Sequence, residues 1–132
     1  YIDDTKGSAT SANALSGNLK FAQNIIAGCV TPLKASDATF DIEAWVAGNN
    51  NTIFSSTDDV QLTDPYKFSS SIAGGDFVGR PNFLQKSGSP AASGASFSGL
   101  IGFQQVSYRG AFDSSNDWTA QWTTWDAENT VY

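Results

Sequence analysis

Residues 18–28 read Asn-Leu-Lys-Phe-Ala-Gln-Asn-Ile-Ile-Ala-Gly, and this stretch decides the fold that the sequence predicts. Side chains alternate across a β-strand, so every second residue shares a face. The doublet Ile25-Ile26 interrupts the alternation directly after Asn24, which indicates a bend or a bulge. We therefore expect a strand that Gly28 ends, with one face formed by Leu19, Phe21, Gln23 and Ile25.

A second strand is expected over residues 100–112, where alternation returns. The intervening residues 69–99 are dense in Ser, Gly and Pro, which is typical of loops. A loop this long in a compact domain needs a reason, such as covering another part of the structure. One face of this second strand would consist of Ile101, Phe103, Gln105, Ser107 and Arg109.

Two short helices are expected between these strands. The first covers residues 40–47, with Thr39 as its N-cap. The second begins near Ser56, runs through Val60 and ends before Pro65, because the residue before a proline resists helical geometry. The side chains of the first helix that should face the core are Phe40, Ala44 and Ala47.

The charge balance excludes several classes of protein. Seven basic and thirteen acidic residues give a net charge of −6, and there is no His. A nucleic-acid-binding protein would normally show a basic stripe, and a protein held by charge on anionic lipid would need basic residues as well. No apolar run approaches the roughly 20 residues of a membrane helix. The absence of His removes the commonest general base and zinc ligand.

The composition favours a secreted β-rich protein. The 132 residues are rich in Ser, Thr, Asn and Gly, and the aromatic content of 13% is too high for a disordered chain. We expect one domain, residues 1–132, located outside the cell or on its outer surface. The start at Tyr1, without Met, suggests a processed product or a fragment. Cys29 is the single cysteine, so no internal disulfide forms, and its apolar neighbours predict a buried side chain.

Three tryptophans near the C-terminus form the densest motif. Trp118, Trp122 and Trp125 are spaced i, i+4 and i+7, which places them on one face of a helical turn. One interpretation is a stacking platform for sugar rings, which would make glycans possible ligands. The other interpretation, which we favour, is that the rings close the open end of an apolar core.

Acidic residues suggest a possible calcium site. Asp113, Ser115 and Asp117 place oxygen ligands at alternating positions, as a calcium loop does, but the Gly and the distant Glu of an EF-hand are missing. The alternative is a turn in which the Asp side chain bonds to its own backbone. A second acidic cluster, which we expect to be solvated or to cap a helix, consists of Asp58, Asp59 and Asp64.

The chain carries no recognisable catalytic motif. There is no Gly-x-Ser-x-Gly, and Gly74-Gly75-Asp76 lacks the Gly-Lys-Ser/Thr that would complete a phosphate loop. The acidic residues show no spacing typical of a paired-carboxylate hydrolase. We therefore expect a protein that is not an enzyme and that has no cofactor apart from the possible calcium ion.

Several stretches resemble the C-terminal region of secreted or lipid-anchored surface proteins of Bacteroidota that carry a right-handed parallel β-helix. The most specific are Tyr108-Arg-Gly-Ala-Phe and Asp117-Trp-Thr-Ala-Gln-Trp-Thr, although the family usually has Gly where Gln121 stands. A third is the run Gly88-Ser-Pro-Ala. The resemblance covers roughly residues 18–132, and its other matching stretches are 18–28, 40–45, 58–65 and 80–95.

The resemblance implies a mainly β fold: the terminal rungs of a β-helix or solenoid with long loops, one or two short helices and an aromatic C-terminal cap. Asn24 would then stand at the corner of a rung. The partners would be the preceding rungs or other protein chains of a surface assembly. A terminal rung exposes unpaired backbone and an apolar interior, so wrapping loops and a cluster of aromatic rings suit such an end.

Three functions remain open from the sequence. The first is a non-enzymatic extracellular or cell-surface structural or adhesion module, which can be a subunit of a larger surface assembly or filament. The second is a carbohydrate-binding module that uses Trp118, Trp122 or Trp125. The third is an accessory part of a polysaccharide-active β-helix enzyme whose active site lies elsewhere.

Overall fold

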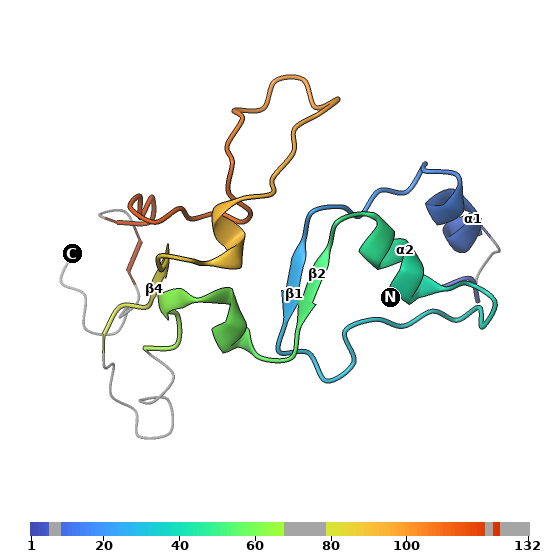
Figure 1. Cartoon of the computed structure of the whole chain (residues 1–132), viewed down its shortest axis with the longest axis horizontal. Helices are drawn as coiled ribbons and strands as arrows, with labels where there is room; N and C mark the ends of the chain where they lie inside the picture. Colours follow the sequence, from blue (N-terminus) through green and yellow to red (C-terminus); the bar gives the residue numbers. More distant parts are fainter. Residues whose placement is uncertain (6–8, 68–78, 121–122, 125–132) are drawn as a thin grey trace.

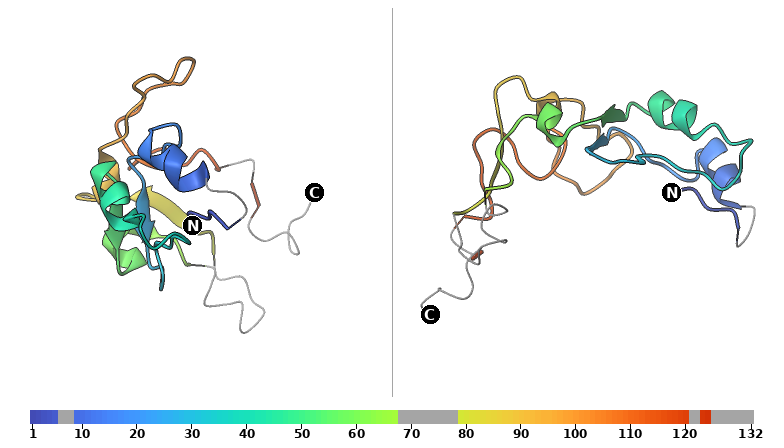
Figure 2. Two further views of the ribbon diagram at one scale, coloured as in Figure 1. Left: turned by 90° about the vertical axis from the view of Figure 1, so that its right-hand side faces the viewer. Right: turned by 90° about the horizontal axis from the view of Figure 1, so that it is seen from below.

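The computed structural model describes residues 1–5, 9–67, 79–120 and 123–124. The described part is elongated, with α1 and α2 at one end and β4 at the other (Figure 1), and the view from below in Figure 2 keeps this order. The elements in chain order are α1 (Ala9–Leu15), β1 (Ile25–Ala27), α2 (Ile42–Gly48), β2 (Thr52–Phe54), the 3-10 helix η1 (Thr57–Val60), β3 (Leu62–Asp64), β4 (Asn82–Gln85) and the 3-10 helix η2 (Pro90–Ala92).

The centre of the described chain is a parallel pair of strands. β1 pairs with β2 in the register Ile25 to Thr52, and α2 lies in the long crossover connection that a parallel pair requires. In the same register, the backbone N–H and the side-chain amide of Asn24 both donate to Asn51 Oδ1, at 2.8 and 3.0 Å. The amide of Asn51 donates in turn to the carbonyl of Phe21, at 2.8 Å. The two asparagines therefore fix the point where both strands begin.

A matching backbone turn precedes each strand. Gln23 and Asn50 both have a φ of 57°, in the left-handed region that most residues avoid. Gln23 also donates its N–H to the carbonyl of Asn49, at 3.1 Å. The chain thus bends at the same register position in both halves of the parallel pair.

A small apolar core lies between the N-terminal segment and α2. Ile2, Ala14 and Phe40 are buried there, and Trp45 packs against them. The indole ring of Trp45 lies 5.9 Å from the ring of Phe40, and its Nε1–H donates to the carbonyl of Ala14, at 3.1 Å. Trp45 therefore joins α1 to α2.

The other end is built on an antiparallel pair, β3 with β4, and on the two 3-10 helices. Ser56 caps η1: its hydroxyl oxygen accepts from the N–H of Asp58, at 3.1 Å, and its own N–H donates to Asp59 Oδ2, at 3.2 Å. The helix expected from Ser56 through Val60 is therefore confirmed as a 3-10 turn, and Asp59 has the capping role expected for it. Ser89 caps η2 and donates its hydroxyl to the carbonyl of Val60, at 2.7 Å. This bond holds η1 and η2 together.

The expected fold class is wrong. The part of the chain that the structure describes contains two sheets of two strands each and two short helices, and no β-helix or solenoid is detected. The reason lies after β2, where the chain turns through η1 and Gln61 into β3, which then pairs antiparallel with β4. A stacked coil would require a further parallel strand at this point.

Both expected strands are also corrected. The first is reduced to Ile25–Ala27, because Gln23 adopts a left-handed conformation that ends the alternating face; Gly28, with a φ of 67°, does end the strand as expected. The second does not form, and residues 100–112 are irregular. Within the segment expected to be loop, residues 69–99, the structure contains β4 and η2.

The first expected helix begins later than predicted. Asp37 accepts from both the N–H and the hydroxyl of Thr39, so Thr39 does not cap a helix, and Asp41 caps α2 instead by accepting from the N–H of Ala44. Phe40 is buried as expected. Ala44 and Ala47 are exposed, and Val46 is the buried side chain of α2 instead. The helix α1 is not among the elements expected from the sequence.

Cys29 is exposed, so the prediction of a buried side chain is wrong. It follows directly after Gly28, which turns the backbone out of β1.

In the described residues there is no helix of the length and hydrophobicity needed to cross a membrane.

Candidate functional site

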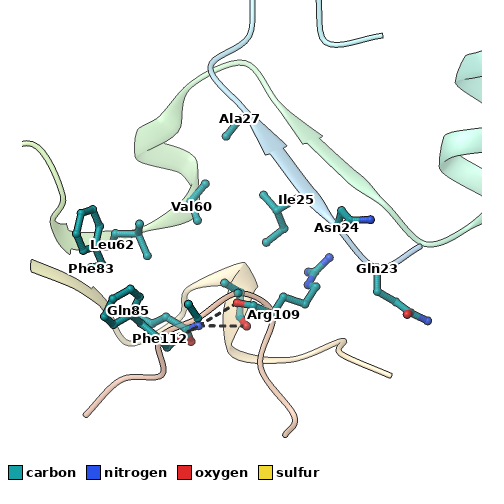
Figure 3. Close-up of a pocket in the computed structure, with 13 residues that line it drawn as sticks. Gln23, Asn24, Ile25, Ala27, Val60, Leu62, Phe83, Gln85, Arg109 and Phe112 are labelled. Atoms are coloured by element: carbon teal, nitrogen blue, oxygen red, sulfur yellow. Dashed lines mark hydrogen bonds between the residues drawn. The ribbon is translucent and has the colours of Figure 1, made fainter. Parts of the chain in front are cut away.

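A cavity of about 360 Å³ lies between β1 and the antiparallel pair of β3 and β4. Figure 3 shows the side chains of β1, η1, β3, β4 and the segment 109–112 directed toward it. Most of its wall is apolar. The lining residues are Gln23, Asn24, Ile25, Ala27, Val60, Leu62, Phe83, Gln85, Ala91, Arg109, Gly110, Ala111 and Phe112.

Gln85 organises one wall of the cavity. Its side chain is only 5% exposed, and its Nε2 donates to the carbonyl of Phe112 at 2.7 Å and, at 3.4 Å, to the carbonyls of Ala91 and Arg109. A buried carbonyl without a donor is costly. The two N–H donors of this amide are therefore shared among carbonyls from three positions, of which that of Ala91 also accepts from the N–H of Arg109 at 2.7 Å. These bonds fix the wall.

Arg109 supplies the positive charge of the cavity. Its Nε donates to the carbonyl of Ser93 at 3.0 Å, one Nη donates to the carbonyl of Pro90 at 2.7 Å, and the other donates to the hydroxyl of Thr52 at 3.3 Å. All three acceptors are neutral. Within residues 1–5, 9–67, 79–120 and 123–124, the ion pair present joins Arg80 to Asp117, so Arg109 forms no ion pair with a described carboxylate.

The predicted tryptophan platform is described only at Trp118. Its side chain is 46% exposed and its indole stacks on Phe112, with ring centres 5.5 Å apart, while Phe112 lies 5.4 Å from Phe83. Trp122 and Trp125 lie outside the described residues. The rings of Phe83, Phe112 and Trp118 thus form a row beside the cavity, and a shared face of three tryptophans stays a prediction.

The residues predicted for calcium bind protein donors. Asp113 Oδ1 accepts from the N–H of Asn116 at 2.6 Å and from both the N–H and the hydroxyl of Ser115, as in an Asp-initiated turn. Asp117 Oδ1 accepts from the N–H and the hydroxyl of Thr119, and its Oδ2 pairs with Arg80 at 3.0 Å. The two carboxylates are thus engaged by different protein groups, and no cluster of three His, Cys, Asp or Glu side chains occurs among the described residues.

These bonds predict acid sensitivity. The hydrogen bonds from Asn116 and Ser115 lower the pKa of Asp113, and those from Thr119, with the charge of Arg80, lower the pKa of Asp117. Because both pKa values are lower in the folded chain, their stabilisation is present above the ordinary carboxyl pKa and is lost as pH falls through the lowered values.

We therefore expect the melting temperature of the wild type to fall from about pH 4 downward, and that of the double variant Asp113→Asn, Asp117→Asn to be lower at neutral pH with a smaller change on acidification. Circular dichroism melts at several pH values measure this. Asp64→Asn is the matched control and should keep the wild-type profile. Identical profiles for the double variant and the wild type would contradict the prediction.

Gln85 and Arg109 were not among the predicted site residues. Gln85 was only one of the residues in a matching stretch, and Arg109 was placed on the face of a strand that does not form. One signal was available: residues 87–108 contain no charged side chain, so Arg109 is an isolated charge in an uncharged region. This signal did not indicate which groups Arg109 would bind, namely the carbonyls of Pro90 and Ser93 and the hydroxyl of Thr52.

Comparison with known proteins adds no assignment. No protein-family model, curated protein or solved structure matches this chain. The resemblance to surface proteins of Bacteroidota therefore stays a prediction.

Proposed function

We propose that the chain is a non-enzymatic structural subunit, located outside the cell or on its surface, that assembles with further copies of itself. The observation that carries this is an apolar arm, residues 95–107, which projects away from the rest of the described chain (Figure 1). The N–H of Ala95 donates to the carbonyl of Ser107 at 3.1 Å and closes its base. At its tip the N–H of Leu100 donates to the carbonyl of Phe97, at 3.0 Å.

The arm presents its largest apolar side chains to solvent. Leu100 is 51% exposed, Ile101 97% and Phe103 63%, and the ring of Phe103 lies 6.5 Å from that of Phe97. An exposed cluster of this kind marks a surface that associates with something apolar. Since the arm has no charged residue, it can enter an apolar surface without desolvating a charge.

A groove on the same chain suits the arm. It has a volume of about 610 Å³, and its lining is apolar except for a few polar side chains, among which Glu43 is the charged one. Ile53 of β2 and the segment 30–33 contribute to it, and Val30 is fully exposed. An arm in one place and a groove in another give a head-to-tail contact, which leads to rings or filaments. The secreted type of composition supports a location outside the cell.

The test is self-association of the purified chain, followed by sedimentation velocity over a range of concentrations. We expect the weight-average mass of the wild type to rise with concentration. The double variant Ile101→Asp, Phe103→Asp should weaken association at least about tenfold, because two charges would have to enter the apolar groove. Ile53→Asp should weaken it from the groove side.

Gln104→Asp is the matched control, since it adds a charge to the arm but keeps the apolar side chains, and it should retain most of the association. A wild type that stays monomeric up to millimolar concentration would contradict assembly through copies of this chain. Loss of association in Gln104→Asp equal to that in the double variant would show that charge alone, and not the apolar contact, decides it.

A further inference from the structure

The cavity between β1 and the β3–β4 pair has the construction of a small-molecule site. Its volume of about 360 Å³ falls within the roughly 300–1,000 Å³ that such sites occupy. Five apolar side chains from separate segments form its main wall: Ile25, Val60, Leu62, Phe83 and Phe112. None of them belongs to the arm or the groove used for the proposed function.

The guanidinium of Arg109 is held in place before any ligand arrives. A guanidinium has five N–H donors in a planar fork. The carbonyls of Pro90 and Ser93 and the hydroxyl of Thr52 take three of them, which leaves two. Because these bonds fix its orientation, a ligand does not have to immobilise a free side chain.

The charge of Arg109 has no partner in the described part of the chain. Its three acceptors are neutral, and Arg109 as a whole is only partly exposed. A carboxylate matches the fork of an arginine and forms charge-assisted bonds with it. Figure 3 shows Arg109 beside the strand that carries Ile25, on the side of the cavity where Gln23 and Asn24 lie.

We infer that this cavity binds a small carboxylate with an apolar body, such as a medium-chain alkanoate. The carboxylate bonds to Arg109, and the apolar chain lies against Val60, Leu62 and Phe83. Both halves are required: the apolar wall supplies area, and the guanidinium orients the ligand.

The test is isothermal titration of the full chain with octanoate, acetate and octanol. We expect saturable binding of one octanoate per chain, at least roughly tenfold weaker binding of octanol, which lacks the charge, and no detectable binding of acetate, which lacks the apolar body. Val60→Trp adds a large ring to the wall of the cavity while it keeps the charge of Arg109, and it should abolish octanoate binding. Leu15→Trp, at an exposed position of α1 away from the cavity, is the matched control and should bind as the wild type does.

Arg109→Gln should reduce octanoate binding to the level of octanol while octanol binding stays unchanged. Arg109 also holds η2 in place, so Arg109→Gln could change the fold. The circular dichroism spectrum of Arg109→Gln is therefore compared with that of the wild type before its octanoate binding is compared with that of Val60→Trp. Equal binding of octanoate and octanol by the wild type overturns the inference, as does octanoate binding that survives in Val60→Trp. Self-association of the chain is measured separately, so either proposal can fail alone.

Discussion

Replacing Gln85 by Ala is expected to lower the free energy of unfolding by about 2–4 kcal/mol. The substitution removes the donor of the 2.7 Å bond to the carbonyl of Phe112 and of the two longer bonds to Ala91 and Arg109, and it leaves these carbonyls without that donor in a buried wall. Urea unfolding followed by circular dichroism measures the change.

Gln85→Met separates the hydrogen bonds from packing, because Met has a similar volume but no donor. It should lose most of the same free energy. Gln104→Ala, in the exposed arm, is the control and should change stability by less than about 0.5 kcal/mol. A Gln85→Met variant as stable as the wild type would show that the amide bonds contribute little.

Replacing Trp45 by Ala is expected to lower the free energy of unfolding by about 3 kcal/mol. The indole packs against the buried cluster of Ile2, Ala14 and Phe40, and it stacks on Phe21 with ring centres 6.5 Å apart. Its loss removes the side chain that joins α1 to α2.

Trp45→Phe keeps a ring in place but removes the hydrogen bond from Nε1–H to the carbonyl of Ala14. It should lower the free energy of unfolding by only about 1 kcal/mol. Thermal and urea unfolding of the two variants measure the difference. Equal destabilisation by Phe and Ala would mean that the hydrogen bond, and not the packing, holds the two helices together.

Local signals predicted local features of this fold. Gly28 ends β1 because a positive φ suits glycine, and Ser56 with Asp59 caps η1 because both bonds lie within one turn. The pairing of β1 with β2 was not predicted, because it depends on Asn24 and Asn51, which lie 27 residues apart. Nothing in either segment alone specifies the other as its partner.

The missing second strand has a different cause. Residues 100–112 alternate well enough to suggest a strand, but alternation does not provide a neighbour to pair with. Gly99 and Gly102, with φ values of 77° and 87°, turn the chain at the tip of the arm instead. The prediction for the C-terminal tail rested on the spacing of three tryptophans, and of these only Trp118 lies in the described part of the chain.

The cavity could not be predicted because its wall comes from segments far apart in sequence. Ile25, Val60, Phe83 and Arg109 come together only through the contacts between η1, η2 and the two sheets. Sequence patterns report which side chains share one strand or one helix, and they do not report which elements meet. The role of Gln85 is hidden for the same reason, since all its acceptors are main-chain oxygens.

The exposed thiol of Cys29 has a practical consequence for work on this protein. As the single cysteine, it accepts a maleimide dye or a spin label at one defined position next to β1, without any engineering. The same thiol can oxidise between two chains, and a covalent dimer formed in storage would imitate reversible association. Sedimentation experiments therefore need a reducing agent throughout.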